Sequence, residues 1–319
     1  MKPVSLRNKL VITIILFVLF YALLAIYSDI DKIKTNYQKI NLSYVGPMLG
    51  ILLSSMFLRS LLQRFFLHNI GIKISKKESY LLFLSGLSML ITPGGAGQVI
   101  KSHFIQKKYG YSISKSLPLV FAERFYDLVA IVVVVLFTLI FYRTLESTII
   151  VFISCILLVV IYLVIKNLKF TKIFQPVLNK IRFLRNLSDT DSEFKFSLEN
   201  FFQTRIIIIS SFIAIVAFLL EGVTMYLGFL TFGIDLGYIK TFQVYYTSVL
   251  FGTISFIPGG VGILEGTFTQ LLLKDGFDIS LITSLIIFIR IVTMWFATVL
   301  GFVATYFTMS NKNKFNHVA

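Results

Sequence analysis

Two short stretches, TPGGAGQ at Thr92–Gln98 and IPGGVG at Ile257–Gly262, interrupt otherwise apolar parts of the chain. Proline and glycine are the residues that a helix interior tolerates least, because proline removes a hydrogen bond and glycine loses the most backbone entropy. Each stretch therefore predicts a break between two helical segments. The shared pattern Pro-Gly-Gly-x-Gly is formed by Pro93, Gly94, Gly95 and Gly97 in the first stretch and by Pro258, Gly259, Gly260 and Gly262 in the second.

The similarity continues downstream of both breaks and predicts an internal repeat. The sequence from Gly110, GYSIS, matches the sequence from Gly276, GFDIS, and an arginine follows each glycine by 14 residues. These arginines are Arg124 and Arg290, and they lie 31 and 32 residues after the prolines of their breaks. One proline-glycine pair would mean little, but two pairs with matched followers indicate two related halves.

Composition places the chain among membrane proteins. Of its 319 residues 56% are hydrophobic and only 14% are charged, whereas soluble domains carry about 25% charged residues. The net charge of +15 is then explained by membrane topology and anionic lipid rather than by nucleic acid, which we do not expect as a partner. The single Cys155, three scattered histidines and the absence of a nucleotide-binding loop motif lead us to expect neither a metal nor a cofactor.

Apolar runs predict how the chain crosses the membrane, since a spanning helix needs about 20 apolar residues. Six segments reach that length, namely 10–27, 44–67, 116–142, 147–165, 205–230 and 281–307. The segments that flank the breaks, 80–92 with 97–109 and 241–257 with 262–274, are shorter and predict re-entrant hairpins. We therefore predict an all-α polytopic membrane protein with about six full transmembrane helices and two re-entrant helical hairpins in an inverted repeat.

The distribution of Lys and Arg predicts the orientation. With both termini in the cytoplasm, 21 of the 30 basic residues lie on cytoplasmic segments and 6 lie outside, while Arg59, Arg124 and Arg290 remain at membrane depth. Three full spans separate the hairpins, so the hairpins enter from opposite sides. This is the arrangement of inverted-repeat transporters, whose paired broken helices mark a substrate site at the midplane.

The expected organisation is one multi-pass domain over 1–319 in the plasma membrane. The repeat halves cover about 44–142 and about 205–307. Between them, 166–204 is a cytoplasmic linker that is either an interfacial basic helix or a solvated loop. The run 10–27 follows basic residues as in a signal peptide, but its length and the missing cleavage site favour a retained first helix.

Ionisable residues inside the apolar segments are the candidates for chemistry, because each costs at least about 2.5–3.5 kcal/mol at a helix centre. They are Arg59, Glu123, Arg124, Asp127, Glu221, Glu265 and Arg290. Glu123 and Asp127 share a helix face, and Arg124 is within ion-pair reach of Asp127. Two interpretations stay open for each residue: a salt bridge that fixes helix packing, or a functional site.

A phosphate-bearing lipid headgroup fits these residue types. Guanidinium groups bind phosphate bidentately, and a glycine turn that opens a helix presents free N–H groups to an anion. The candidate headgroup-binding residues are Arg124, Arg290, Glu123, Asp127, Glu265, Gly94, Gly95, Gly97, Gly259, Gly260, Gly262, Gln98 and Lys101, with Pro93 and Pro258 as structural breaks. The alternative for the glycine turns is tight packing without a ligand.

These motifs resemble the membrane region of the lysylphosphatidylglycerol synthase family, also called flippase-like integral membrane proteins. The family pattern is matched in the first half by Pro93, Gly94, Gly97, Glu123, Arg124 and Asp127, and in the second by Pro258, Gly260, Gly262, Glu265 and Arg290. Gln98 departs from it, since the family usually has Glu there. Members with a soluble domain transfer lysine from aminoacyl-tRNA to phosphatidylglycerol, and we expect this chain to lack that domain because it ends about ten residues after the last span.

The resemblance implies lipid translocation, with membrane lipids, either anionic phospholipids or lipid-linked phosphates, as partners. Two other functions stay open. One is a membrane-embedded transferase acting on lipid-linked substrates, with Glu123 or Glu265 as a general base. The other is a non-transporting membrane partner. A second copy of the chain or a separate lipid-modifying enzyme is a further expected type of partner.

Overall fold

The computed structural model describes residues 6–90, 98–166, 192–255 and 257–310, and every regular element in these ranges is helical. Pro93, Gly94, Gly95 and Gly97 and most of the 166–204 linker lie outside the described residues. In chain order the elements are α1 (Leu6–Tyr27), α2 (Ile30–Gln38), the 3₁₀ turn η1 (Leu42–Tyr44), α3 (Val45–Asn69), α4 (Lys76–Leu87), α5 (Ile100–Tyr109), α6 (Ile113–Ser116), α7 (Pro118–Thr138), α8 (Leu145–Lys166), α10 (Ser192–Phe201), α11 (Thr204–Thr231), α12 (Gly237–Ile254), the 3₁₀ turn η4 (Pro258–Gly260), α13 (Ile263–Lys274), α14 (Ile279–Arg290), the π-helical turn η5 (Ile291–Trp295) and α15 (Phe296–Ser310).

The six predicted apolar segments are all helical to within a few residues of their expected bounds. Within the described residues, four helices are long and apolar enough to cross a membrane: Leu42–Asn69, Leu145–Lys166, Thr204–Thr231 and Ile279–Thr308. Helix α7 is also long, but Glu123, Arg124 and Asp127 lie within it. The protein is therefore a polytopic, all-helical membrane protein.

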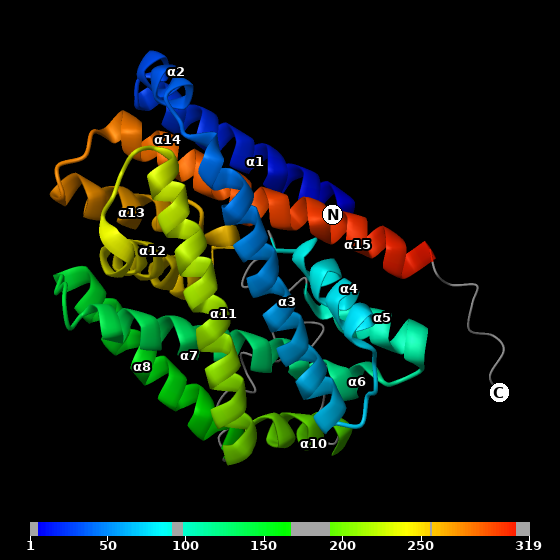
Figure 1. The fold of residues 1–319 in the computed structure, drawn as a ribbon. Helices are drawn as coiled ribbons and strands as arrows, with labels where there is room; N and C mark the ends of the chain where they lie inside the picture. The colour runs from blue at the N-terminus through cyan, green and yellow to red at the C-terminus, as the bar shows by residue number, and fades with distance from the viewer. Residues whose placement is uncertain (1–5, 91–97, 167–191, 256, 311–319) are drawn as a thin grey trace, which may run out of the picture.

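The centre of the fold is the pair α3 and α11, which lie side by side along most of their length (Figure 1). Small residues allow the close approach: the Ser55 hydroxyl donates to the Ala217 carbonyl over 2.8 Å, and Gly228 leaves space for the Met48 methyl. Inside a membrane, small residues and hydrogen bonds hold helices together because lipid removes the hydrophobic drive between them. The pair thus separates α4 and α5 on one side from α12 and α13 on the other (Figure 1).

Helix α8 illustrates how the outer surface suits lipid. Phe152, Ile153, Ile156 and Val159 are all exposed, although they are among the most apolar side chains of the chain. Exposed apolar surface of this extent marks a membrane or protein interface in general. In a chain with several membrane-length helices it is the face that contacts acyl chains.

The two broken segments have matching local structure after their breaks, which supports the sequence repeat. Gly110 ends α5 and Gly276 follows α13, and both have left-handed backbone, with φ of 77° and 84°. Ser112 then caps α6 by accepting from the Lys115 N–H, as Asp278 caps α14 by accepting from the Ser280 N–H. Equivalent residues therefore make equivalent turns before the helices that carry the matched arginines.

Helix α15 passes unusually close to α4. A Cβ atom built at Gly301 would lie 2.2 Å from the Ser88 backbone nitrogen, so only glycine fits this crossing. By contrast, a Cβ at Gly46 or Gly50 of α3 would meet no atom within 4 Å. Gly301 thus sets the approach of the last helix to α4, whereas Gly46 and Gly50 do not limit the packing of α3.

Candidate functional site

The ionisable residues inside the apolar helices gather into two groups, each built around the segment that follows one break. The first-half cluster, named for the predicted repeat half that supplies all of its members except Glu221, consists of Arg59, Gln63, Gln98, Lys101, Glu123, Arg124, Asp127 and Glu221. The second-half cluster consists of Tyr21, Gly259, Gly262, Glu265 and Arg290. Each cluster joins the helix that follows a break to the helix that carries the matched arginine, α5 to α7 and α13 to α14.

Lys101 is the most deeply buried cation of the first-half cluster, with 1% of its side chain exposed. Its ammonium group forms an ion pair with Glu123 of α7 and donates to the Gln63 side-chain oxygen over 3.3 Å. Its aliphatic stem packs on Gly86 of α4, where a Cβ would lie 2.9 Å from the Lys101 Cδ. A buried charge needs this kind of pairing, so Lys101 ties α5 to α7 and is shielded from a headgroup in this conformation.

Arg59 links three helices through two carboxylates. Its guanidinium lies 2.7 Å from Asp127 of α7 and 3.7 Å from Glu221 of α11. The rings of Phe83 and Phe218 lie over the same guanidinium, with centroids 5.7 and 4.9 Å away, which favours the cation further. With Lys101 and Arg124, Arg59 brings three cations against the three carboxylates of the cluster, which is therefore charge-balanced.

Arg124 is the cation of this cluster with free hydrogen-bonding capacity. Its side chain is 37% exposed, and it lies 2.8 Å from Asp127, which confirms the predicted ion pair. The same terminal nitrogen donates to the Gln98 side-chain oxygen over 3.4 Å, while the buried Nε has no hydrogen-bond partner among the described residues. A guanidinium has five N–H donors, so Arg124 can accept a further anionic ligand.

Gln98 acts directly on this arginine. An amide oxygen accepts a hydrogen bond without neutralising the guanidinium, whereas a glutamate would form a second ion pair with it. The departure of Gln98 from the family pattern therefore leaves Arg124 with Asp127 as its charged partner in the described part of the chain.

The second-half cluster is built on the glycine turn. Gly259, Gly260 and Gly262 all have positive φ, between 61° and 86°, a backbone that disfavours any other residue. The turn directs the Gly259 carbonyl at Arg290, which donates to it over 3.1 Å, and the Gly262 N–H at Glu265, which accepts over 2.7 Å. Glu265 thus holds the start of α13 against the turn.

Glu265 is fully engaged in this structure. It lies 2.6 Å from the guanidinium of Arg290 and accepts a 2.7 Å hydrogen bond from the hydroxyl of Tyr21, with 2% of its side chain exposed. Tyr21 belongs to α1, outside both repeat halves. The first helix therefore completes the polar contacts of the second half.

Each cluster contains one buried ion pair, and the positions of the cation and the carboxylate are reversed between the two clusters. In the first half the cation Lys101 is on the arm and the carboxylate Glu123 is on the following helix, whereas in the second half Glu265 is on the arm and Arg290 on the helix. In both halves the arm residue follows the last glycine of the break by one helical turn. In both clusters an ion pair thus connects the helix after the break to the following long helix, with the charges reversed.

Sequence reasoning identified most of these residues, but of their contacts it predicted only the ion pair of Arg124 with Asp127. It singled out Arg59 and Glu221 as charges inside apolar segments without assigning them partners. It missed Tyr21, Gln63 and Tyr245, whose hydroxyl donates to Glu221 over 3.1 Å, because a polar residue in an apolar helix is too common to be a signal. Arg124 and Arg290, expected to act together, belong to separate clusters.

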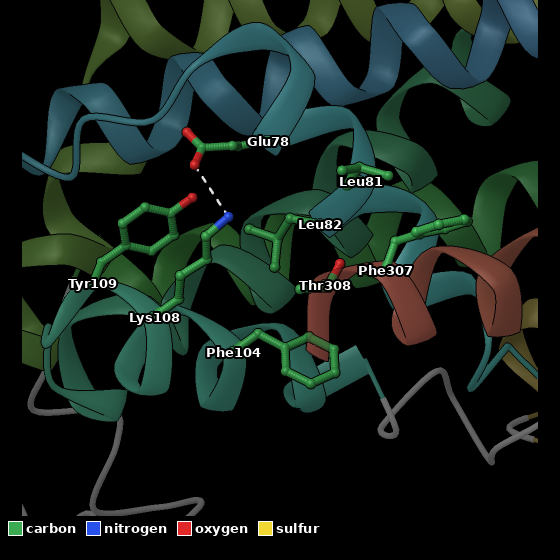
Figure 2. A pocket seen from close by; sticks show the side chains of 8 residues that line it. All are labelled: Glu78, Leu81, Leu82, Phe104, Lys108, Tyr109, Phe307 and Thr308. Atoms are coloured by element: carbon green, nitrogen blue, oxygen red, sulfur yellow. Dashed lines mark ion pairs between the residues drawn. The ribbon is translucent and has the colours of Figure 1, made fainter. Parts of the chain in front are cut away.

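A small cavity lies beside the first hairpin, between α4, α5 and α15 (Figure 2). Its volume is about 20 Å³, which is too small for a headgroup. Glu78 and Lys108 form a 3.1 Å ion pair across it, next to Tyr109, so the far ends of α4 and α5 are held together (Figure 2). Burial raises the pKa of Glu78, but hydrogen bonds from Ser75 and Lys108 outweigh it and lower the pKa to about 2.

Among the residues that the structure describes, no group of three or more His, Cys, Asp or Glu side chains is placed to hold a metal ion. The chemistry of the two clusters is that of hydrogen-bonded ion pairs. Such groups can bind and release a charged headgroup, and Arg124 has a buried Nε donor without a partner among the described residues.

Comparison with known proteins identifies one family over most of the chain. Residues 10–301 match the model of the lysylphosphatidylglycerol synthase TM region. The UPF0104 membrane protein PH1989 of Pyrococcus horikoshii is 27% identical over 247 residues, which cover 69% of this chain and 72% of that protein. A UPF0104 membrane protein of Methanothermobacter thermautotrophicus is 30% identical over 105 residues, or 33% of this chain and 30% of that protein. Since the family model spans nearly all of a multi-pass integral membrane protein, the chain belongs to the lysylphosphatidylglycerol synthase transmembrane-region family.

Proposed function

We propose that this protein is a lipid translocase that moves a phosphate-bearing lipid headgroup, of a phospholipid or a polyprenyl-phosphate-type lipid, across the membrane. The observation that carries the proposal is that Arg124 is partly exposed and has an unpaired hydrogen-bond donor among the described residues. It is a partly exposed guanidinium inside an apolar helix, and its buried Nε lacks a partner in the described part of the chain. A cation at membrane depth with unused donors is a functional-site hypothesis by default.

The transport path in this proposal follows the repeat. The fold consists of about six full spans and two re-entrant hairpins, α4 with α5 and α12 with α13, which enter from opposite sides of the plasma membrane. Both termini are cytoplasmic. A headgroup bound near the two breaks would be exposed to one leaflet and then the other as one half rocks against the other.

The clusters have distinct roles in this scheme. Arg124 contacts the phosphate, and Asp127 keeps its ion pair with Arg59 or turns to a cationic part of the headgroup. The buried pairs Lys101–Glu123 and Glu265–Arg290 keep each arm attached to its helix during the motion. Tyr245 of α12, bonded to Glu221, links the first-half cluster to the helix that precedes the second break. Transport is passive or ion-coupled.

A liposome assay tests the proposal. Purified protein is reconstituted with fluorescent phosphatidylglycerol, and the fraction of label accessible to an external reductant is followed. We expect Arg124→Ala to slow the wild-type rate by about tenfold or more, the effect of losing one charge-assisted contact to phosphate. Arg143→Ala, an exposed arginine outside both clusters, is the control. Wild-type rates in an Arg124→Ala, Arg290→Ala double variant would refute the proposed site.

The topology is tested separately by thiol labelling. In a Cys155→Ser background, a cysteine at the exposed position Lys195 should react only with reagent in the cytoplasm, and one at the exposed position Lys39 only with external reagent. Reaction of both from the same side would exclude the orientation while leaving the lipid assay to decide the function.

A further inference from the structure

A groove runs along one face of the second half, between α1, α13 and the start of α14. Its volume is about 650 Å³, and it is open on one side. It is lined by Phe20, Leu24, Tyr27, Gly262, Glu265, Gly266, Thr269, Gln270, Leu273, Lys274, Ile279 and Thr283. Ligand sites of small molecules have volumes of about 300–1,000 Å³, so the groove has the size of a binding site.

The two long walls of the groove differ in chemistry. Helix α1 contributes Phe20, Leu24 and Tyr27, which recur at helical spacing and form one apolar stripe. Helix α13 contributes the polar side chains of Thr269 and Gln270 and the cation Lys274, with Leu273 as an apolar residue among them. An amphipathic groove of this kind matches a molecule with an apolar chain and a charged head.

Lys274 is the solvent-exposed cation that lines the groove. Its side chain is 53% exposed, and its ammonium group pairs with Glu146 of α8, which also accepts from Gln270 over 3.0 Å. An ammonium has three N–H donors, and Glu146 is the one carboxylate that pairs with Lys274 among the described residues, so this exposed lysine has donors for an anion that shares it with Glu146. Glu265 at the opposite end is buried and already engaged by Arg290 and Tyr21, so it does not call for a cation.

We infer that this groove binds a glycerophospholipid, with the phosphate at Lys274 and Gln270 and an acyl chain along the α1 stripe. A soluble anion would not need the apolar wall, and a neutral lipid would not need the lysine. The inference deepens the proposed function, on which it rests for its role: it supplies the lateral access by which a lipid reaches the second break.

Hydrogen bonds attach α1 and the segment after it to the second half at both ends of the groove. At one end of the groove the Ser28 hydroxyl hydrogen-bonds Thr283 over 2.7 Å, and the Tyr37 hydroxyl donates to the Ser284 carbonyl over 3.0 Å, so α14 anchors the residue that follows α1 and the end of α2. At the inner end, the Tyr21–Glu265 bond holds the same helix. The groove is the space left between these two attachments.

Gly266 allows a direct test. It is helical, and a Cβ built on it meets no atom within 4 Å, so a larger residue should fill the groove without straining the backbone. Gly50 of α3 has the same open surroundings in another part of the fold. Gly266→Leu and Gly50→Leu therefore add the same volume to the groove and to an unrelated helix face.

The experiment uses the full-length protein in nanodiscs with phosphatidylglycerol that carries a photoreactive diazirine on an acyl chain. Adducts are mapped by peptide mass spectrometry. We expect adducts on α1 and α13 that fall by about tenfold in Gly266→Leu, and change less than about twofold in Gly50→Leu. Leu24→Trp, which fills the groove from the α1 side, should give the same loss and guards against a folding defect of the first variant.

Headgroup recognition is read with a second pair of variants. Lys274→Gln should weaken competition by unlabelled phosphatidylglycerol by about tenfold and leave competition by diacylglycerol unchanged. Lys34→Gln, on the exposed surface of α2, should change neither. Equal competition by both lipids in the wild type would overturn the assignment of the phosphate to Lys274, and labelling that ignores Gly266→Leu and Leu24→Trp would overturn the groove as the site.

The translocation assay separates this inference from the proposed function. Loss of groove labelling in Gly266→Leu with an unchanged translocation rate would show that the groove is not the access route, while translocation itself stands. Groove labelling in a wild-type protein that moves no lipid would refute translocation and leave the binding site in place.

Discussion

Lys101 of α5 and Glu123 of α7 form an ion pair that is almost completely buried, with 1% and 8% of their side chains exposed. The pair joins the arm after the first break to the helix that carries Arg124. The equivalent link in the second half, between Glu265 and Arg290, uses the opposite polarity. Some of the charged residues in the apolar helices therefore have a structural role: each ion pair holds the helix after a break against a neighbouring helix.

The Lys101–Glu123 pair gives the first prediction. Removing one partner leaves an uncompensated buried charge, so Lys101→Met or Glu123→Leu alone should lower the free energy of unfolding by about 3–5 kcal/mol. The double variant should lose less than the sum, because two apolar side chains of similar volume need no partner. Denaturation of the four proteins in detergent gives the coupling free energy. Additive losses would show that the two charges do not stabilise each other.

A second prediction concerns Gln98 and Arg124. In Gln98→Glu the new carboxylate should form an ion pair with Arg124 and compete with an anionic headgroup, so that the apparent affinity for phosphatidylglycerol falls by about tenfold. Gln98→Ala removes the hydrogen bond without adding charge and should change the affinity much less. If Gln98→Glu binds phosphatidylglycerol as the wild type does, Arg124 is not the phosphate contact in this state.

The crossing of α15 over α4 gives a third prediction. Gly301→Ala should lower the free energy of unfolding by about 1–3 kcal/mol, because its Cβ would lie 2.2 Å from the Ser88 backbone nitrogen and the helices must separate. Gly50→Ala is the matched control, since it meets open space and improves helix propensity by about 0.5–1 kcal/mol. Equal thermal stability of the two variants would contradict the close approach.

Glu78 makes part of the stability dependent on pH. Its pKa is lowered from 4.5 to about 2 in the folded protein, because hydrogen bonds from Ser75 and Lys108 outweigh the effect of burial. Its stabilising contribution is therefore complete above pH 4.5 and is lost as the pH falls towards 2. The thermal midpoint of the wild type should drop from pH 6 to pH 3 by more than that of Glu78→Gln.

The control for this titration is Asp31→Asn on the exposed surface of α2, which removes a carboxylate that is not part of the first hairpin. It should keep the wild-type dependence on pH. Parallel curves for the wild type and Glu78→Gln would show that the capping contact does not contribute between these pH values.

The sequence by itself determined the positions of the helices and the matching turns at Gly110 and Gly276. Apolar length decides where a helix can cross a membrane, and Pro-Gly-Gly-x-Gly breaks a helix through its own backbone. Both effects act within a few residues, so the helices are found where they were expected, and Gly110 and Gly276 make the same turn. The pairing of Arg124 with Asp127 was predictable for the same reason, because residues three apart on a helix are neighbours.

Only the tertiary structure decided which charges meet across helices. Lys101 and Glu123 are 22 residues apart, and Tyr21 and Glu265 are 244 residues apart. Such partners are chosen by helix packing, which depends on close contacts such as that of Gly301 with Ser88 and not on any local period. The groove between α1 and α13 arises in the same way, from two surfaces that the chain order does not place together. The residue types of the two ion pairs are written in the sequence, but packing decides that they meet, because a buried charge is stable only beside a partner that neutralises it and satisfies its hydrogen bonds.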